Sequence, residues 1–332
     1  IVELQALIQT AGGIAVLGDI NTEGGDFVNR DKIINIYQGR YEGQDPRTDA
    51  EKRQIYCQYI AQRAGALPLR GMDRKESDAG SKRSTLSLAG VYTGLDIQQS
   101  TSEKMMEDML AKGKWREKGL KDVRNLAKDD EDKIRPISAL EAATLSRKWV
   151  LLGDPGSGKT TFVNYLTQVL AQQNFENLSA WKEEERGILP IVIILRDFYR
   201  WAQSKGENKA NANHLWKFIC HDLETKNLLF AEKLLENALE GGKAILMFDG
   251  LDEVPPGDAR AFVRDSVLAF HVRYDKNRFL VTCRVLSYQN EKWQLPKEDF
   301  LSFELAPFSD EKIAEFIKAW YSEVAQKWNV PT

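Results

Sequence analysis

The sequence is poor in the residues that build disulfide frameworks and thiolate or imidazole metal sites. It has three cysteines and three histidines in 332 residues. Cys57, Cys220 and Cys283 are far apart and no CxxC pair occurs, so a disulfide scaffold or a cysteine zinc site is not expected. His214 and His221 flank Cys220, but no fourth ligand is evident, and the segment has the pattern of an ordinary amphipathic helix. We expect a reducing compartment, the cytoplasm.

Long apolar runs and a charge of one sign are also missing. No apolar stretch approaches the ~18 to 20 residues of a membrane-spanning helix, and the first twenty residues lack the basic start of a signal peptide. Lys and Arg number 46 against 49 Asp and Glu, a net charge of −3, which argues against general binding to nucleic acids or anionic membranes. The length and the 42% hydrophobic content suggest a globular chain of about two domains. Because the chain starts at Ile1 and stops straight after an expected helix, we expect a part of a longer protein or a protein whose ends were removed.

From Trp149 onwards, short apolar runs alternate with amphipathic stretches. The runs are typical of strands buried on both faces, and their alternation with helices predicts a parallel α/β sheet with right-handed crossovers. The expected strands are 149–152, 191–195, 244–248, 279–283 and 300–305, and the expected helices are 159–173, 213–226, 230–240 and 258–271.

The flanks of this region are predicted more coarsely. Upstream, residues 48–64 have a helical pattern, and residues 86–95 suggest a short strand or a packed extended segment. Downstream, Ser309 is the expected cap of an amphipathic helix. That helix has one apolar side, formed by Ile313, Phe316, Ile317 and Trp320.

A phosphate-binding loop follows the first of these strands. Residues 153–160, GDPGSGKT, match G-x-x-x-x-G-K-[ST] between an expected strand and an expected helix. The glycines allow positive φ and a close approach of the backbone, so that successive N–H groups and the helix N-terminus can point at phosphate oxygens. Lys159 would reach the β- and γ-phosphates, and the Thr160 hydroxyl would bind Mg²⁺. The predicted nucleotide-binding residues are Gly153, Asp154, Pro155, Gly156, Ser157, Gly158, Lys159, Thr160 and Thr161.

An acidic motif follows a second strand. The apolar run 244–248 leads directly into Asp249, which is predicted to bind Mg²⁺ together with Thr160. Asp252 and Glu253 come just after it at the same sheet edge, where a carboxylate can orient an attacking water, and the choice between them stays open. Gly250 occupies the position in which many ATPases have the catalytic Glu, so we expect slow hydrolysis.

An arginine follows a third strand. If the strand 279–283 lies beside the strand 244–248, Arg284 emerges near the γ-phosphate and can sense or stabilise its charge. The guanine-reading NKxD motif is absent, so ATP is the expected nucleotide. The sheet edge would then carry both the metal site and the catalytic residues.

Together, three motifs resemble the NACHT family of STAND nucleotide-dependent switches. They are GDPGSGKTT at 153–161, LMFDGLDEVP at 246–255 and LVTCR at 280–284. A small residue after the metal-binding acid, followed by two more acids, is typical of that family. The flanking segments also look like those of bacterial multidomain NACHT proteins: 24–33, 66–73, 86–96 and 305–321.

The resemblance implies an organisation and a function. The expected division is a Gly-rich linker or short strands over 1–40, a helical and extended region with a charged linker over 41–134, a NACHT-like P-loop domain over 135–305, and the start of a helical domain over 306–332. Proteins of this type bind ADP in a closed state. Sensing of a ligand and exchange for ATP then open them and drive self-association, often in bacterial signalling or defence. Effector and sensor regions would lie outside this chain.

Two other functions fit the same motifs. A small-molecule kinase on a P-loop core is one, since RDFYR (196–200) faintly suggests a substrate loop. The other is an oligomerisation scaffold that binds nucleotide without turnover. Transfer of a labelled γ-phosphate to an acceptor other than water favours the kinase, and the absence of any ADP product favours the scaffold.

Overall fold

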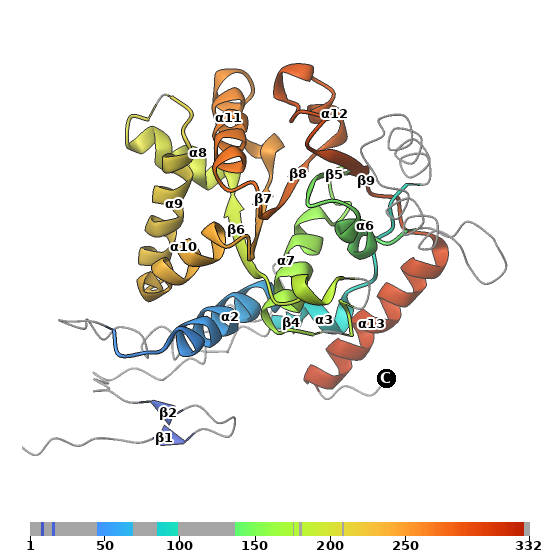
Figure 1. Ribbon diagram of the computed structural model, residues 1–332. Helices are drawn as coiled ribbons and strands as arrows, with labels where there is room; N and C mark the ends of the chain where they lie inside the picture. The colour runs from blue at the N-terminus through green and yellow to red at the C-terminus, as the bar shows by residue number, and fades with distance from the viewer. Residues whose placement is uncertain are drawn as a thin grey trace, which may run out of the picture.

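The computed structural model describes residues 8–9, 15–16, 45–68, 85–98, 137–174, 176–178, 181–207 and 209–328. Its centre is a five-stranded sheet of order β6-β7-β8-β5-β9, in which all neighbouring strands run parallel (Figure 1). The strands are β5 (Lys148–Leu152), β6 (Leu189–Ile194), β7 (Ala244–Asp249), β8 (Arg278–Cys283) and β9 (Leu301–Glu304). The predicted parallel α/β sheet is confirmed, and each of its strands lies on one of the apolar runs.

Helices cover both faces of the sheet (Figure 1). The core on one face joins the sheet to α6 and α7, and the core on the other face joins it to α8, α9, α10 and α11. Their bounds are α6 (Ala139–Leu145), α7 (Lys159–Ala171), α8 (Leu195–Ser204), α9 (Ala212–Thr225), α10 (Glu232–Glu240) and α11 (Asp258–Arg273). The strands are apolar on both sides because both sides are covered.

The sequence analysis missed two of these helices and one boundary. Helix α6 begins with a capping box in which Ser138 and Glu141 bond each other's backbone N–H groups. Helix α8 begins at Leu195, which was assigned to the preceding strand, and it contains the RDFYR segment. Leu195 is fully buried, so hydrophobicity alone could not separate the end of the strand from the start of the helix.

Two further segments pack against this core. Helix α2 (Asp49–Gly65) lies against α7 and near α10, and its N-terminus is a capping box of Thr48 and Glu51. Over residues 86–95, where a short strand or a packed extended segment is expected, the structure has a short strand, a helical turn and an extended part. A short strand, β4 (Thr85–Ser87), pairs antiparallel with β3 (Ala66–Pro68), and the helix α3 (Leu88–Val91) follows it before the chain becomes extended. That extended part forms bridges to Ser138 and Leu305.

Helix α13 (Asp310–Trp328) packs against α3 and β4. Its first turn is capped by Ser309, whose hydroxyl accepts a hydrogen bond from the backbone N–H of Lys312 at 3.4 Å. On the predicted apolar side, Ile313, Phe316 and Ile317 are exposed. No helix among the described residues is long and apolar enough to cross a membrane.

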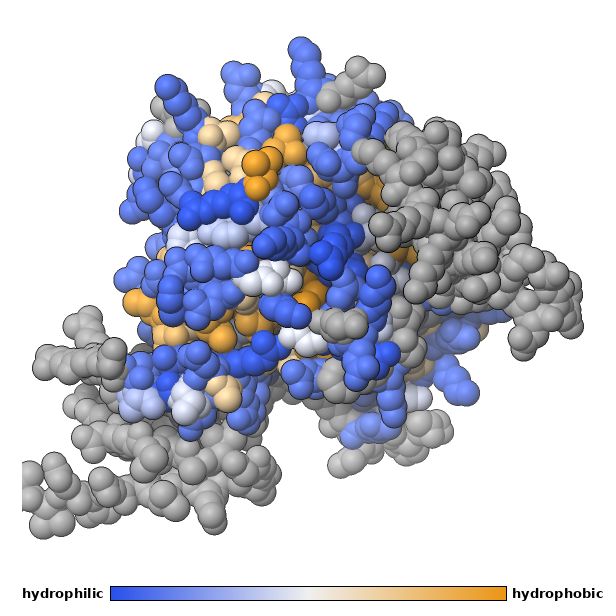
Figure 2. Space-filling view, in the orientation of Figure 1, coloured by the Kyte–Doolittle hydropathy of each residue, from blue (hydrophilic) through white to orange (hydrophobic). Residues whose placement is uncertain are grey.

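The remaining described elements are small. They are the antiparallel pair β1 (Ile8–Gln9) and β2 (Ala15–Val16), the helix α12 (Val285–Tyr288), and the 3-10 turns η1 (Glu183–Glu185), η2 (Leu229–Ala231), η3 (Leu251–Glu253) and η4 (Glu291–Trp293). The charged run at 102–133 and most of residues 1–40 lie outside the described residues. The described surface in Figure 2 is mostly hydrophilic, with apolar side chains gathered where α10 approaches α2.

Candidate functional site

The phosphate-binding loop joins β5 to α7 at the carboxyl edge of the sheet. Gly156 and Gly158 have φ of +79° and +94°, in the left-handed region that favours glycine. Gly153 does not, and its role is one of space, because a Cβ atom there would lie 2.4 Å from Ser157 Oγ. Asp154 and Pro155 are exposed at the top of the loop, and Thr160 and Thr161 lie in the first turn of α7. The loop is therefore a turn of backbone that faces outward above a helix N-terminus, as phosphate binding requires.

The Lys159 side chain lies within this loop. Its Nζ donates to the carbonyl oxygens of Gly153 (2.7 Å) and Asp154 (2.9 Å) and lies 3.3 Å from Ser157 Oγ. Burial lowers the pKa of Lys159, while the negative charge of Asp252 opposes that shift. A partly desolvated ammonium group among backbone dipoles is suited to bind a phosphate.

Three side chains from three elements meet behind the loop. Asp249 ends β7, and its Oδ2 accepts from Thr160 Oγ1 at 2.9 Å while its Oδ1 accepts from Thr282 Oγ1 at 2.6 Å. The same Thr282 hydroxyl accepts from the backbone N–H of Gly250 at 2.8 Å. We call Thr160, Asp249 and Thr282 the acid network. Carboxylate and hydroxyl oxygens are ligands that Mg²⁺ prefers, so Thr160 and Asp249 fit such an ion.

Thr282 was missed as a site residue. It lies within the quoted motif LVTCR, one position before the end of β8. The strand order was the missing information, because β8 lies directly between β5 and β7. The condition that the sequence analysis set for Arg284, a position beside the strand of Asp249, is therefore met.

Both acids that follow Asp249 form ion pairs with arginines. Asp252 Oδ2 lies 2.8 Å from Arg284 Nε, and its Oδ1 accepts from the Arg284 backbone N–H at 3.0 Å. Glu253 Oε2 lies 2.9 Å from an Nη atom of Arg196, at the start of α8. The Asp252 side chain is only 7% exposed, against 41% for Glu253. The two carboxylates thus point to different neighbours, Asp252 to the residue that follows β8 and Glu253 to the start of α8, which follows the outer strand β6.

Arg260 holds the turn that carries these acids. From the first turn of α11, its guanidinium donates to the carbonyl oxygens of Asp252 (2.9 Å) and Val254 (2.8 Å) and stacks on the Trp293 ring at 4.4 Å. Arg260 is buried, so it has a structural role beneath the site. Gly250 begins the turn with a φ of +80°.

The segment before the core also contacts the loop. A Cβ atom on Gly158 would lie 3.2 Å from the Leu95 side chain, and the neighbouring Asp96 forms an ion pair with Lys312 of α13 at 2.7 Å. Lys312 Nζ also donates to the carbonyl oxygen of Gly94. The extended residues 92–98 therefore lie between the phosphate-binding loop and α13.

A parallel sheet with a glycine-rich loop after its first strand and an acid at the end of its third defines a P-loop NTPase core. The chain matches the NACHT domain over residues 147–324, more than half of its length, and it belongs to this family of nucleotide-binding P-loop NTPases. Comparison with curated protein sequences gave no match. The predicted fold class and the predicted family are confirmed.

Proposed function

We propose that this chain is the nucleotide module of a STAND-type switch, which binds ATP and ADP with Mg²⁺ and hydrolyses ATP slowly. The observation that carries the proposal is the acid network: Thr160, from the phosphate-binding loop, bonds to Asp249 two strands away. That contact brings the phosphate-binding loop and the strand-end acid into one site. Mg²⁺, when bound by Thr160 and Asp249, supplies positive charge that neutralises the phosphates.

The other residues have distinct roles in this proposal. Lys159 and the backbone N–H groups of the loop 153–161, in which Pro155 has none, bind the phosphates, and Arg284 senses the γ-phosphate from the end of β8. Catalysis would rest on positioning and on charge stabilisation by these groups. For the water, we favour Asp252 over Glu253, because Asp252 is close enough to Lys159 to oppose the lowering of its pKa, while Glu253 is turned toward Arg196.

Slow turnover follows from the same contacts. Asp252 has both oxygens bonded to Arg284, so it must leave that arginine before it can accept a proton from water. Asp252→Asn should lower the single-turnover rate of ATP hydrolysis by about 100-fold or more, and Glu253→Gln should change it little. If Glu253→Gln instead lowers the rate strongly and Asp252→Asn changes it little, Glu253 positions the water.

The switching function is proposed on the basis of the family to which the chain belongs. The cytoplasmic location, the bacterial signalling or defence role, the self-association on activation and the effector and sensor regions outside the chain all rest on the resemblance to STAND proteins. The exposed apolar side of α13 is consistent with further packing in such an assembly.

The first experiment is to denature the purified protein and to identify any released nucleotide by chromatography. The switch predicts retained ADP, because a closed state holds its product. Lys159→Ala is the control and should release none. An empty wild-type protein that transfers a labelled γ-phosphate to a small acceptor would favour the kinase, and one that never forms ADP would favour the scaffold.

A further inference from the structure

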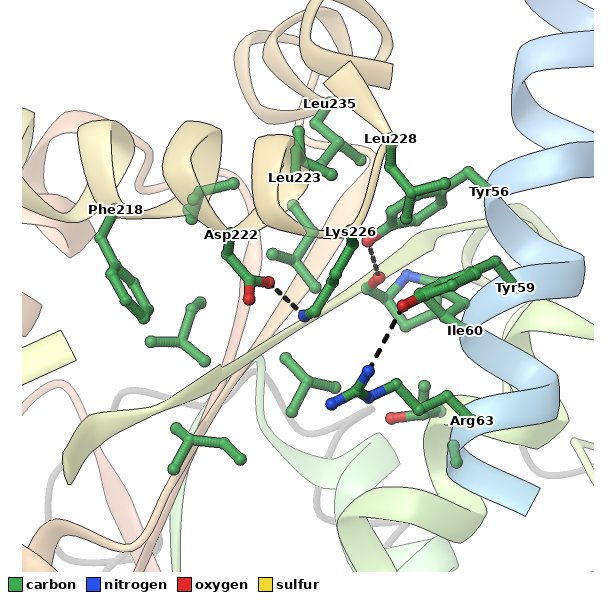
Figure 3. Close-up of a pocket in the computed structure, with 18 of the residues that line it drawn as sticks. Tyr56, Tyr59, Ile60, Arg63, Phe218, Asp222, Leu223, Lys226, Leu228 and Leu235 are labelled. Atoms are coloured by element: carbon green, nitrogen blue, oxygen red, sulfur yellow. Dashed lines mark hydrogen bonds and ion pairs between the residues drawn. The ribbon is translucent and has the colours of Figure 1, made fainter. Parts of the chain in front are cut away.

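A cavity lies at the outer edge of the sheet, away from the phosphate-binding loop (Figure 3). It has a volume of about 320 Å³, within the range of ligand sites. Side chains from α2, α7 and α9, the turn after α9, and the strand β6 line it. None of the lining residues belongs to the acid network or to the loop 153–158.

The strand at this cavity has an open edge. In a strand, the N–H and C=O groups of one residue point to the same side, and successive residues alternate. The Leu189 N–H bonds toward β7, to the carbonyl of Lys243, whereas the Pro190 carbonyl faces outward and accepts from the Tyr56 hydroxyl at 2.9 Å. Val192 lies two residues after Pro190 and therefore has the same orientation. Its backbone N–H and C=O both face outward, toward the cavity.

Tyr56 and Pro190 close the first half of this edge and leave the second half open. Proline has no N–H to offer, and burial raises the pKa of Tyr56, which keeps its hydroxyl a donor. Beyond Val192, Ile194 is 41% exposed at the end of the strand. An unpaired strand edge of this kind accepts an added strand unless it is blocked.

One positive charge at the cavity has no acidic partner among the described residues. Arg63 projects from α2, and within that part of the chain it makes one hydrogen bond, of 3.3 Å to the Tyr59 hydroxyl, and no ion pair. By contrast, Lys226 on the opposite wall is paired with Asp222. Among the described lining residues, the free charge at the cavity is therefore the guanidinium of Arg63.

Arg63 and the edge strand meet at the same cavity. Tyr56, on the same helix as Arg63, donates to the carbonyl of Pro190, and Arg63 and Val192 both line the hollow. The helix α2 crosses β6 at a steep angle, and the Arg63 side chain extends from it into the cavity (Figure 3).

The wall between these polar groups is apolar. Ile60 from α2, Phe218 and Leu223 from α9, and Leu228 from the following turn face the cavity (Figure 3). Within the part of the chain that the structure describes, the site thus combines the outward-facing backbone N–H and C=O of Val192, a guanidinium without an acidic partner and an apolar hollow.

We propose that this cavity binds the C-terminal end of an extended peptide. The peptide backbone would pair with Val192, its terminal carboxylate would bind Arg63, and an apolar side chain near its end would enter the hollow. A small apolar carboxylate would use Arg63 and the hollow but would not need the strand edge, so the open backbone of Val192 favours the peptide.

The test uses fluorescein-labelled octapeptides with free α-carboxylates and four randomised C-terminal positions. The full chain should select peptides with an apolar C-terminal residue. For the best peptide, Arg63→Gln should weaken binding about tenfold or more, as should amidation of the carboxylate. Gln62→Glu is the matched control: it changes the charge of the same helix by the same amount, Gln62 is not among the residues that line the cavity, and the substitution should leave binding unchanged.

Backbone pairing has its own test. Methylation of each backbone N–H in turn among the last four residues should abolish binding at one or two positions, and bound peptide should slow hydrogen exchange in β6. If no peptide binds the wild type better than Arg63→Gln, or if decanoate binds as tightly as the best peptide, the proposal is wrong. Thermal unfolding of the variants checks that both fold as the wild type does.

Discussion

Thr282 offers the sharpest test of how the site is built. Its hydroxyl donates to Asp249 and accepts from the Gly250 N–H, and its side chain is almost fully buried. Thr282→Val keeps the shape but removes both bonds. A hydrogen bond to a charged group contributes about 1.5–3 kcal/mol, and a buried N–H left unpaired costs about 1–3 kcal/mol. Because Asp249 keeps its bond from Thr160, we expect the free energy of unfolding to fall by about 3 kcal/mol.

The chain offers a matched control for this substitution. Thr167 is equally buried, but its hydroxyl donates to the Val163 carbonyl, four residues earlier in the same helix. That carbonyl keeps its helical bond when the hydroxyl is removed, so Thr167→Val should cost about 1 kcal/mol or less.

The assay is urea unfolding without nucleotide, followed by titration of a fluorescent ATP analogue with and without Mg²⁺. Thr282→Val should also lose most of the Mg²⁺-dependent part of the affinity, because Asp249 is then held by Thr160 alone. Equal stability losses for the two variants, or an unchanged Mg²⁺ effect in Thr282→Val, would refute this account of the acid network.

Three other predictions follow from single contacts. Gly158→Ala should lower the free energy of unfolding by about 2 kcal/mol and remove most nucleotide binding, because Gly158 has a φ of +94° and the new methyl group would press on Leu95. Nucleotide binding at the wild-type affinity would contradict this prediction. Lys312→Met should cost about 1 kcal/mol in urea unfolding and speed hydrogen exchange at residues 92–98, since it removes the ion pair to Asp96; unchanged exchange would argue against that tie. Burial lowers the pKa of His271, so protonation favours the unfolded chain and stability should fall as the pH drops below about 6.5. His271→Phe should reduce that fall in pH-dependent unfolding, and an identical pH profile would exclude His271 as its source.

Local patterns in the sequence were enough to predict the sheet core, the glycine-rich loop between β5 and α7, and the family. Each strand of the sheet is a short apolar run, because a strand covered on both faces has no polar side. The loop 153–160 could be predicted because positive φ, close backbone approach and a helix start all need particular residues at fixed spacing. Asp249 could be placed because an acid directly after a buried strand lies at the sheet edge.

Other features depend on which strands become neighbours, and only the fold decides that. Thr282 reaches Asp249 because β8 lies beside β7, and Asp252 and Glu253 differ because one faces Arg284 and the other Arg196. The helix α8 and the cavity beside β6 were likewise not visible in the sequence. A run of residues specifies its own periodicity, but a hydrogen bond between residues 33 apart, such as that from Thr282 to Asp249, depends on the packing of every element between them.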